Sequence, residues 1–249
     1  MSLDKKIEKL AELAIKIGLN VQKGDLVQIK IDVERTDLSR KLVKKAYESG
    51  ASKVIVDYAD DQKKILDYTY QNKETLKEIP NYEYEKEEYL LKQGVKQLFV
   101  SSDNPELLKD IDSEKIKEVS IARSTKMGSL MHYRMNDIVS WTIISAPTKE
   151  WAKIVFPNSE NAEEDLWEAI FDTTRVNTED PVKSWKDNLQ KLSEKADWLN
   201  EMNFDKLHYT SSNGTDFTMG LPKGHIWRAA IAKNAKGERF VPNMPTEEV

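Results

Sequence analysis

The feature that most constrains the fold is a strand–helix–strand pattern within the first sixty residues. A run rich in β-branched side chains at 25–31 predicts a strand, and a helix capped by Thr36 or Asp37 is expected to end at Gly50. A second apolar run at 53–57 predicts another strand. A helix that returns the chain to the same end of a sheet makes the two strands parallel. We therefore predict the α/β fold class, with a parallel sheet and flanking helices.

Helices and strands continue to alternate through the next 140 or so residues of the sequence. Apolar runs predict strands at 96–101 and 137–145. Pro105 suits the first turn of a helix, so we predict that a helix opens at 103–106. The other predicted helices cover 3–19, much of 60–92 with a break at Pro80, 112–135, the residues around Trp151, 161–173 and 181–199.

The composition changes near residue 203, and we expect a domain boundary there. From Leu207 onward the pattern is typical of β-strands, and Asn213 with Gly214 between two such runs is a strong hairpin signal. We expect an N-terminal α/β domain at 1–202, followed at 203–249 by the start of a mainly β-containing second domain. A stretch this short is too small for a core of its own, so we expect the second domain to be incomplete in this chain.

Composition and charge exclude several classes of protein. The formal net charge of −5 argues against a nucleic-acid partner, and the lack of cysteine excludes disulfides and thiolate metal sites. Three histidines lie far apart, so a histidine-rich zinc site is not expected. The start of the chain has no apolar run typical of a signal peptide, and no window is long enough for a membrane span. We expect a cytoplasmic protein with no membrane partner.

Few residues outside the end of the chain are candidates for chemistry. Glycine-rich phosphate-binding motifs are missing, so no cofactor-binding residues are predicted. Asp57, Asp60 and Asp61 follow a predicted strand, where parallel sheets often bind ligands, although a solvated loop is the better interpretation. His225 is a candidate for substrate binding or for a structural hydrogen bond, whereas His208 lies in a predicted strand and is interpreted as inert.

The last ten residues, 240–249, combine two prolines with two adjacent carboxylates. Pro242 and Pro245 fix φ and favour extended backbone before them, so Glu247 and Glu248 are expected on a non-helical segment. A carboxylate on a rigid segment suits a hard or borderline metal ion. A frayed acidic tail is the alternative interpretation of the same residues.

An ordered set of short segments is more informative than any one of them. The segments are 12–25, 50–54, 103–106, 141–152, 156–157, 212–216, 220–225 and 243–249. With these segments in this order, the whole chain resembles the aminopeptidase T and aminopeptidase S family of metallo-aminopeptidases.

The resemblance implies a fold, an activity and one site residue. Members of the family carry an N-terminal α/β domain and a C-terminal catalytic domain with two divalent metal ions, remove N-terminal residues from peptides and form homodimers. By resemblance, Glu248 is the first metal ligand, with Glu247 as the fallback. The family's other metal ligands and catalytic groups would lie beyond Val249, so no catalytic residue is assigned here.

The sequence thus predicts a metal-dependent aminopeptidase that acts on peptides through a metal-activated hydroxide. The metals would be zinc, cobalt or magnesium, and the 249-residue chain is expected to be inactive alone. A non-catalytic α/β module for binding or dimerisation is the alternative.

Overall fold

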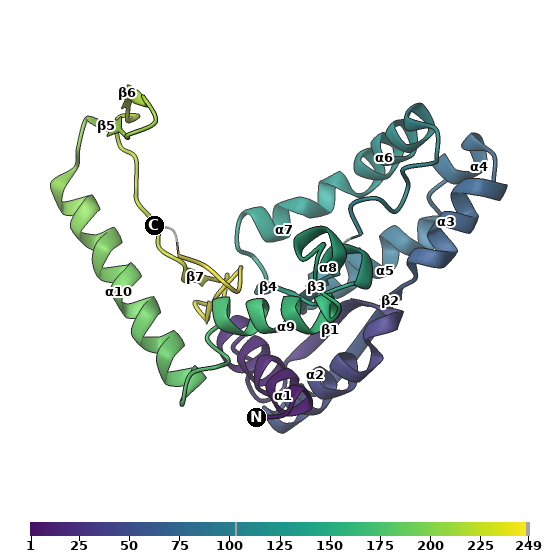
Figure 1. The fold of residues 1–249 in the computed structure, drawn as a ribbon, viewed down its shortest axis with the longest axis horizontal. Helices are drawn as coiled ribbons and strands as arrows, with labels where there is room; N and C mark the ends of the chain where they lie inside the picture. Colours follow the sequence, from purple (N-terminus) through teal and green to yellow (C-terminus); the bar gives the residue numbers. More distant parts are fainter. Residues whose placement is uncertain (103, 248–249) are drawn as a thin grey trace.

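A four-stranded parallel sheet in the order β2-β1-β3-β4 forms the centre of the molecule (Figure 1). This computed structural model describes residues 1–102 and 104–247. Three strand pairs are parallel, and Ile29 of the central strand lies beside Val56 and Leu98. The predicted fold class, α/β with a parallel sheet, is confirmed. The strands are β1 (Leu26–Asp32), β2 (Lys53–Ala59), β3 (Lys96–Ser101) and β4 (Trp141–Ser145).

Helices cover both faces of this sheet, because the chain changes its winding direction at β1. It first passes from β1 to β2, and then crosses back over β1 to reach β3. Right-handed crossovers put the connecting helices of these two steps on opposite faces, as Figure 1 shows. One face carries α1 (Leu3–Leu13), α2 (Thr36–Glu48) and α9 (Ala162–Thr173). The other carries α3 (Asp61–Tyr70), α4 (Lys73–Lys77), α5 (Asn81–Lys92), α6 (Ser113–Met127) and α7 (His132–Met135).

Short helical segments complete this part of the chain. They are the π-helical turn η1 (Ala14–Gly18), the 3-10 turns η2 (Val33–Arg35) and η3 (Gly128–Met131), and α8 (Lys149–Val155). None of the described helices is both long and apolar enough to cross a membrane.

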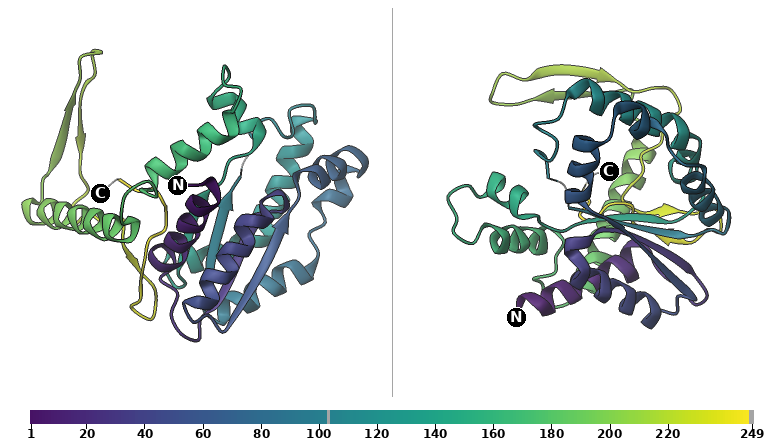
Figure 2. Two further views of the ribbon diagram at one scale, coloured as in Figure 1. Left: turned by 60° about the horizontal axis from the view of Figure 1, so that its bottom comes forward. Right: turned by 90° about the vertical axis from the view of Figure 1, so that its right-hand side faces the viewer.

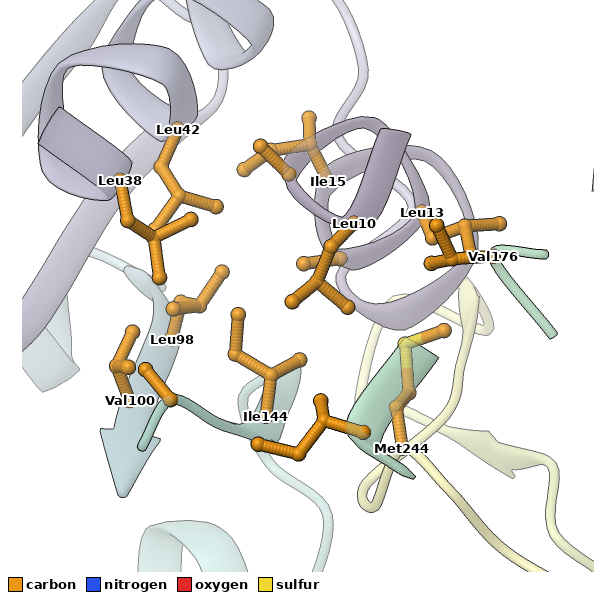
Figure 3. Close-up of a cluster of buried hydrophobic side chains, with 14 of the residues drawn as sticks. Leu10, Leu13, Ile15, Leu38, Leu42, Leu98, Val100, Ile144, Val176 and Met244 are labelled. Atoms are coloured by element: carbon orange, nitrogen blue, oxygen red, sulfur yellow. The ribbon is translucent and has the colours of Figure 1, made fainter. Parts of the chain in front are cut away.

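The main core lies between the sheet and the layer of α1, α2 and α9. Figure 3 shows Leu10, Leu42, Leu98 and Ile144 from these elements, and each of the four is fully buried. Burial of one such side chain stabilises the fold by about 1.5–3 kcal/mol. Successive side chains of β1 point to opposite faces of the sheet. Its buried apolar residues face this core, whereas polar residues such as Gln28 face the helices on the other side.

Two predictions about local structure are wrong. Instead of the helix predicted to open at 103–106, residues 105–110 form turns, and residue 103 lies outside the described residues. The backbone closes successive turns here, because the N–H of Leu107 donates to the carbonyl of Asn104 and that of Lys109 to the carbonyl of Glu106, both at 3.1 Å. The predicted strand 137–145 begins only at Trp141, because the N–H of Ile138 donates to the carbonyl of Tyr133 at 2.8 Å and prolongs the preceding helical turn.

The chain then leaves the sheet along α10 (Pro181–Met202). Asp180 caps this helix by accepting the N–H of Lys183 at 3.0 Å. Beyond α10, β5 (Lys206–Thr210) and β6 (Asp216–Gly220) pair as the hairpin that Asn213 and Gly214 predict. The hairpin stands clear of the sheet and its helices (Figure 2), and every residue of β6 is exposed. A smaller pair, β7 (Ala232–Lys233) and β8 (Arg239–Phe240), leads into the terminal segment.

Candidate functional site

The terminal segment, residues 240–247, lies against the edge of the central sheet. The backbone N–H of Ile143 in β4 donates to the carbonyl of Pro242 at 2.8 Å, and the N–H of Met244 donates to the carbonyl of Ile143 at 3.0 Å. The N–H of Val241 donates to the carbonyl of Gly18 at 2.8 Å. The segment therefore extends the sheet beyond β4 and covers an edge that would otherwise expose its backbone groups.

Side-chain packing fixes the same segment. Phe240, Val241, Met244 and Thr246 are all buried, and Met244 enters the core in Figure 3. Met244 packs so close to the backbone of Gly18 that a side chain at position 18 would displace it, because a Cβ there would lie 2.9 Å from the Met244 sulfur. The interpretation of this segment as a frayed tail is therefore wrong through residue 246.

The two acids that follow were the predicted metal-binding candidates. Glu248, the predicted ligand, lies outside the described residues. Glu247, the fallback, is exposed, but its Oε1 atom lies 2.5 Å from Nη2 of Arg175. An arginine partner competes with a metal ion for the carboxylate, so this pair disfavours Glu247 as a ligand. The ion pair with Arg175 holds the Glu247 side chain.

Arg175 is positioned by the loop that follows α9. It adopts a left-handed conformation with φ of 61°, and its guanidinium lies 5.3 Å from the ring centroid of Trp185 in α10. The indole N–H of Trp185 donates to the carbonyl of Thr174 at 2.7 Å. α10 thus fixes the arginine that holds the terminal segment, a contact that the sequence did not reveal.

The described residues do not form a metal site among themselves. Across 1–102 and 104–247, no three histidine, aspartate or glutamate side chains are gathered so that they could hold a metal ion. His225 has Nδ1 2.9 Å from the carbonyl of Pro222, which agrees with a structural role. His208 has Nε2 2.7 Å from Oδ1 of Asp216 across the hairpin, far from the terminal segment in sequence.

Asp57, Asp60 and Asp61, the possible ligand-binding residues near the end of the second strand, lie in three different environments. Asp60 caps α3 by accepting the N–H of Lys63 at 3.0 Å. Asp57 accepts a hydrogen bond from Gln28 at 2.7 Å and forms an ion pair with Lys86. Its interpretation as part of a solvated loop is therefore wrong. Asp61, the first residue of α3, lines a cleft at the carboxyl ends of the strands.

The sequence did not indicate the role of Glu87, which lies at the centre of a buried polar network between α5 and the sheet. Its carboxylate accepts hydrogen bonds from Lys30 at 2.7 Å, from Gln97 at 2.7 Å and from Gln28 at 3.2 Å. Burial raises the pKa of Glu87, but the charge of Lys30 and these hydrogen bonds outweigh it, so the pKa lies below its ordinary value. A signal was present, because Glu87 occupies the same helical stripe as the buried Leu90 and Leu91.

Replacing Glu87 with glutamine should lower the free energy of unfolding by about 1.5–3 kcal/mol near neutral pH, since a charge-assisted network loses its anion. The pKa of Glu87 is lower in the folded protein than in the unfolded chain, where it is about 4.3. The ionised carboxylate therefore stabilises the fold fully above that unfolded pKa. This contribution is lost as the pH falls through the pKa of the folded protein. The difference between wild type and E87Q should therefore shrink in acid. Urea unfolding of both proteins from about pH 7 down to about pH 3 measures it.

Glu88 provides the matched control for this prediction. It follows Glu87 in α5, and its partner Lys92 lies 2.9 Å away at the surface. E88Q should cost less than about 1 kcal/mol with little dependence on pH. Equal losses for E87Q and E88Q at neutral pH would contradict the role assigned to the buried carboxylate.

Comparison with known families places the chain among metalloproteases. Residues 3–249 match the family described as thermophilic metalloprotease (M29). The chain belongs to this family. The resemblance to aminopeptidases T and S predicted from the ordered segments is thereby confirmed.

Several M29 relatives are similar along nearly all of the chain. Aminopeptidase PepS of Streptococcus thermophilus is 42% identical over 98% of this chain and 59% of its own length. Aminopeptidase AmpS of Bacillus subtilis is 41% identical over 100% of this chain and 61% of its own length. A solved structure of wild-type AmpT from Thermus thermophilus superposes with a TM-score of 0.91 at 33% identity, over 99% of this chain and 61% of that one. The chain thus spans about 60% of the length of these M29 relatives.

Proposed function

We propose that the protein is a metal-dependent aminopeptidase that releases N-terminal amino acids from peptides. The observation that carries this proposal is the similarity to M29 relatives over nearly the whole chain, because the relatives at 41–42% identity are named aminopeptidases. Fold alone would not be enough, since an α/β sheet serves many unrelated activities.

We also propose that Glu248 is the first ligand of a two-metal site. Two features support this assignment: the neighbouring Glu247 pairs with Arg175, and residues 240–246 are anchored to the sheet. One carboxylate cannot hold two ions, and the described residues contribute no cluster of ligands. The other ligands would come from the part of the relatives' length that this chain does not span. Zinc, cobalt and magnesium are the candidate metals.

The proposed organisation follows the same relatives. Residues 1–202 would form an N-terminal α/β domain, and 203–249 would begin the catalytic domain. The end of α10 at Met202 and the exposed hairpin that follows support this boundary, and residues 240–246 would then be the part of the second domain that packs on the sheet of the first. We further propose a cytoplasmic homodimer that acts on peptides and has no nucleic-acid or membrane partner.

The proposal is tested by the coding sequence that follows codon 249 and by the activity of its product. We expect the reading frame to continue and to supply further acidic and histidine ligands. The longer product should hydrolyse an aminoacyl-p-nitroanilide with added Zn²⁺, Co²⁺ or Mg²⁺, and the 249-residue chain should not. Metal content measured on both proteins shows whether activity and metal binding depend on the same added segment.

Two outcomes would contradict the proposal. A stop codon directly after codon 249 would favour a non-catalytic α/β binding or dimerisation module. A longer product that folds and binds metal, yet releases no N-terminal residue from any peptide, would exclude aminopeptidase activity.

A further inference from the structure

A cleft of about 690 Å³ lies at the carboxyl ends of the parallel strands. Its lining includes the last residues of β1, β2 and β3. The winding direction of the chain reverses between β1 and β3, which are neighbours in the sheet. In open α/β sheets, small ligands bind in the crevice outside the strand ends at this kind of reversal. The volume is also in the range of small-molecule sites.

The two sides of the cleft are apolar. Phe99 and Ile143 contribute from the sheet, and Leu107 and Leu108 contribute from the turns that follow β3. Both leucines are half-buried, so part of each side chain remains available to a ligand. An apolar group with the size of an aliphatic side chain suits the space between these walls.

The rim of the cleft carries charges of both signs. Lys30 and Lys64 supply two cations, and Asp32, Asp57 and Asp61 supply three anions. Lys64 forms no salt bridge with any residue in the described part of the chain. Lys30 already pairs with Glu87, and Asp57 already pairs with Lys86. The rim still carries the Lys64 ammonium beside the carboxylates of Asp32 and Asp61, so a molecule with both charges is favoured.

Neighbouring groups hold the polar side of the cleft in place. The Lys30 ammonium is 2.7 Å from the buried carboxylate of Glu87 and 5.5 Å from the ring centroid of Phe99. The hydroxyl of Ser102, which also lines the cleft, is buried and has no hydrogen-bond partner within residues 1–102 and 104–247. This oxygen is closed to solvent, so a ligand in the cleft would contact the Lys30 and Lys64 ammonium groups rather than this hydroxyl.

We propose that this cleft binds a small zwitterion, namely a free α-amino acid with an aliphatic side chain. The ligand carboxylate would face Lys64 and Lys30, its ammonium group would face the aspartates, and its side chain would lie between Phe99 and the two leucines. Binding at this site would not require peptidase activity. It would give the N-terminal α/β part of the chain a function of its own.

The test is a calorimetric titration of the 249-residue chain with L-leucine in the presence of a metal chelator. Binding should be saturable with one site for each chain. L-Leucinamide lacks the carboxylate and N-acetyl-L-leucine lacks the ammonium group, and each should bind at least about tenfold more weakly because one charge-assisted contact is lost. The chelator excludes binding through a metal, so a failure here is distinct from a failure of the proposed aminopeptidase activity.

Variants locate the site. K64Q should weaken L-leucine binding about tenfold, and it should not disturb folding because Lys64 is exposed. K63Q is the matched control, since Lys63 is adjacent on α3 but pairs with Asp67 at 2.5 Å and does not line the cleft. K63Q should change binding less than about twofold.

Three results would overturn the proposal. The first is no saturable binding of L-leucine. The second is equal binding of N-acetyl-L-leucine, which would indicate a simple anion site. The third is equal loss of binding in K64Q and K63Q, which would indicate a general effect of charge.

Discussion

Replacing Glu248 with alanine is expected to lower metal-dependent aminopeptidase activity at least about 1000-fold in the product of the complete reading frame. A metal ion in a hydrolase contributes several kcal/mol of transition-state stabilisation, and each 1.36 kcal/mol corresponds to about tenfold in rate. Loss of one metal ligand would remove much of that contribution. The measurement is kcat/KM for an aminoacyl-p-nitroanilide, together with metal content by elemental analysis.

E247A is the matched control for E248A. Glu247 already pairs with Arg175 at 2.5 Å and is exposed, so its loss should lower activity less than about tenfold. Both variants remove one carboxylate from adjacent positions, which makes general charge effects equal. The opposite order, with E247A inactive and E248A active, would show that Glu247 is the ligand and that the assignment to Glu248 is wrong.

Replacing Trp185 with alanine is expected to lower the free energy of unfolding by about 3–5 kcal/mol, which is the usual cost of removing a buried aromatic side chain. Trp185 is fully buried where α10 meets the loop after α9. The substitution opens a cavity, removes the donor to the Thr174 carbonyl and takes the ring from beneath the Arg175 guanidinium. Urea unfolding followed by circular dichroism measures the loss.

Trp198 offers the matched control in the same helix. It is 47% exposed, so W198A should cost less than about half as much as W185A. We also expect W185A, but not W198A, to speed amide hydrogen exchange in residues 241–246, because Arg175 no longer holds the terminal segment firmly. Equal destabilisation by the two substitutions would contradict the role of Trp185 as the anchor of α10.

Local patterns in the sequence were enough to predict most of the elements that surround the sheet. The amphipathic spacing of 181–199 predicted α10, and its stripe contains the buried Trp185, Leu189 and Ala196. Asn213 and Gly214 predicted the β5–β6 hairpin. The helix predicted at 103–106 was wrong, because the backbone N–H groups of Leu107 and Lys109 close turns on Asn104 and Glu106 in place of helical bonds.

The candidate site was predicted less completely, because its residues come from distant parts of the chain. The sequence indicated an extended acidic segment and, through the resemblance, a ligand at Glu248. It did not indicate that Arg175 neutralises Glu247. It also did not place Lys30, Lys64 and Phe99 around one cleft, since each lies on a different element.

By itself, the sequence determined the α/β class and the parallel sheet, because the periodicities of strands and helices are local. It also determined the membership of the M29 family, because an ordered set of segments is specific to one family. Only the tertiary structure decided what becomes of residues 240–247. Two prolines make that segment extended, but its backbone hydrogen bonds go to Ile143 and Gly18. Such pairing depends on which sheet edge remains open after the helices have packed, and no local pattern encodes that.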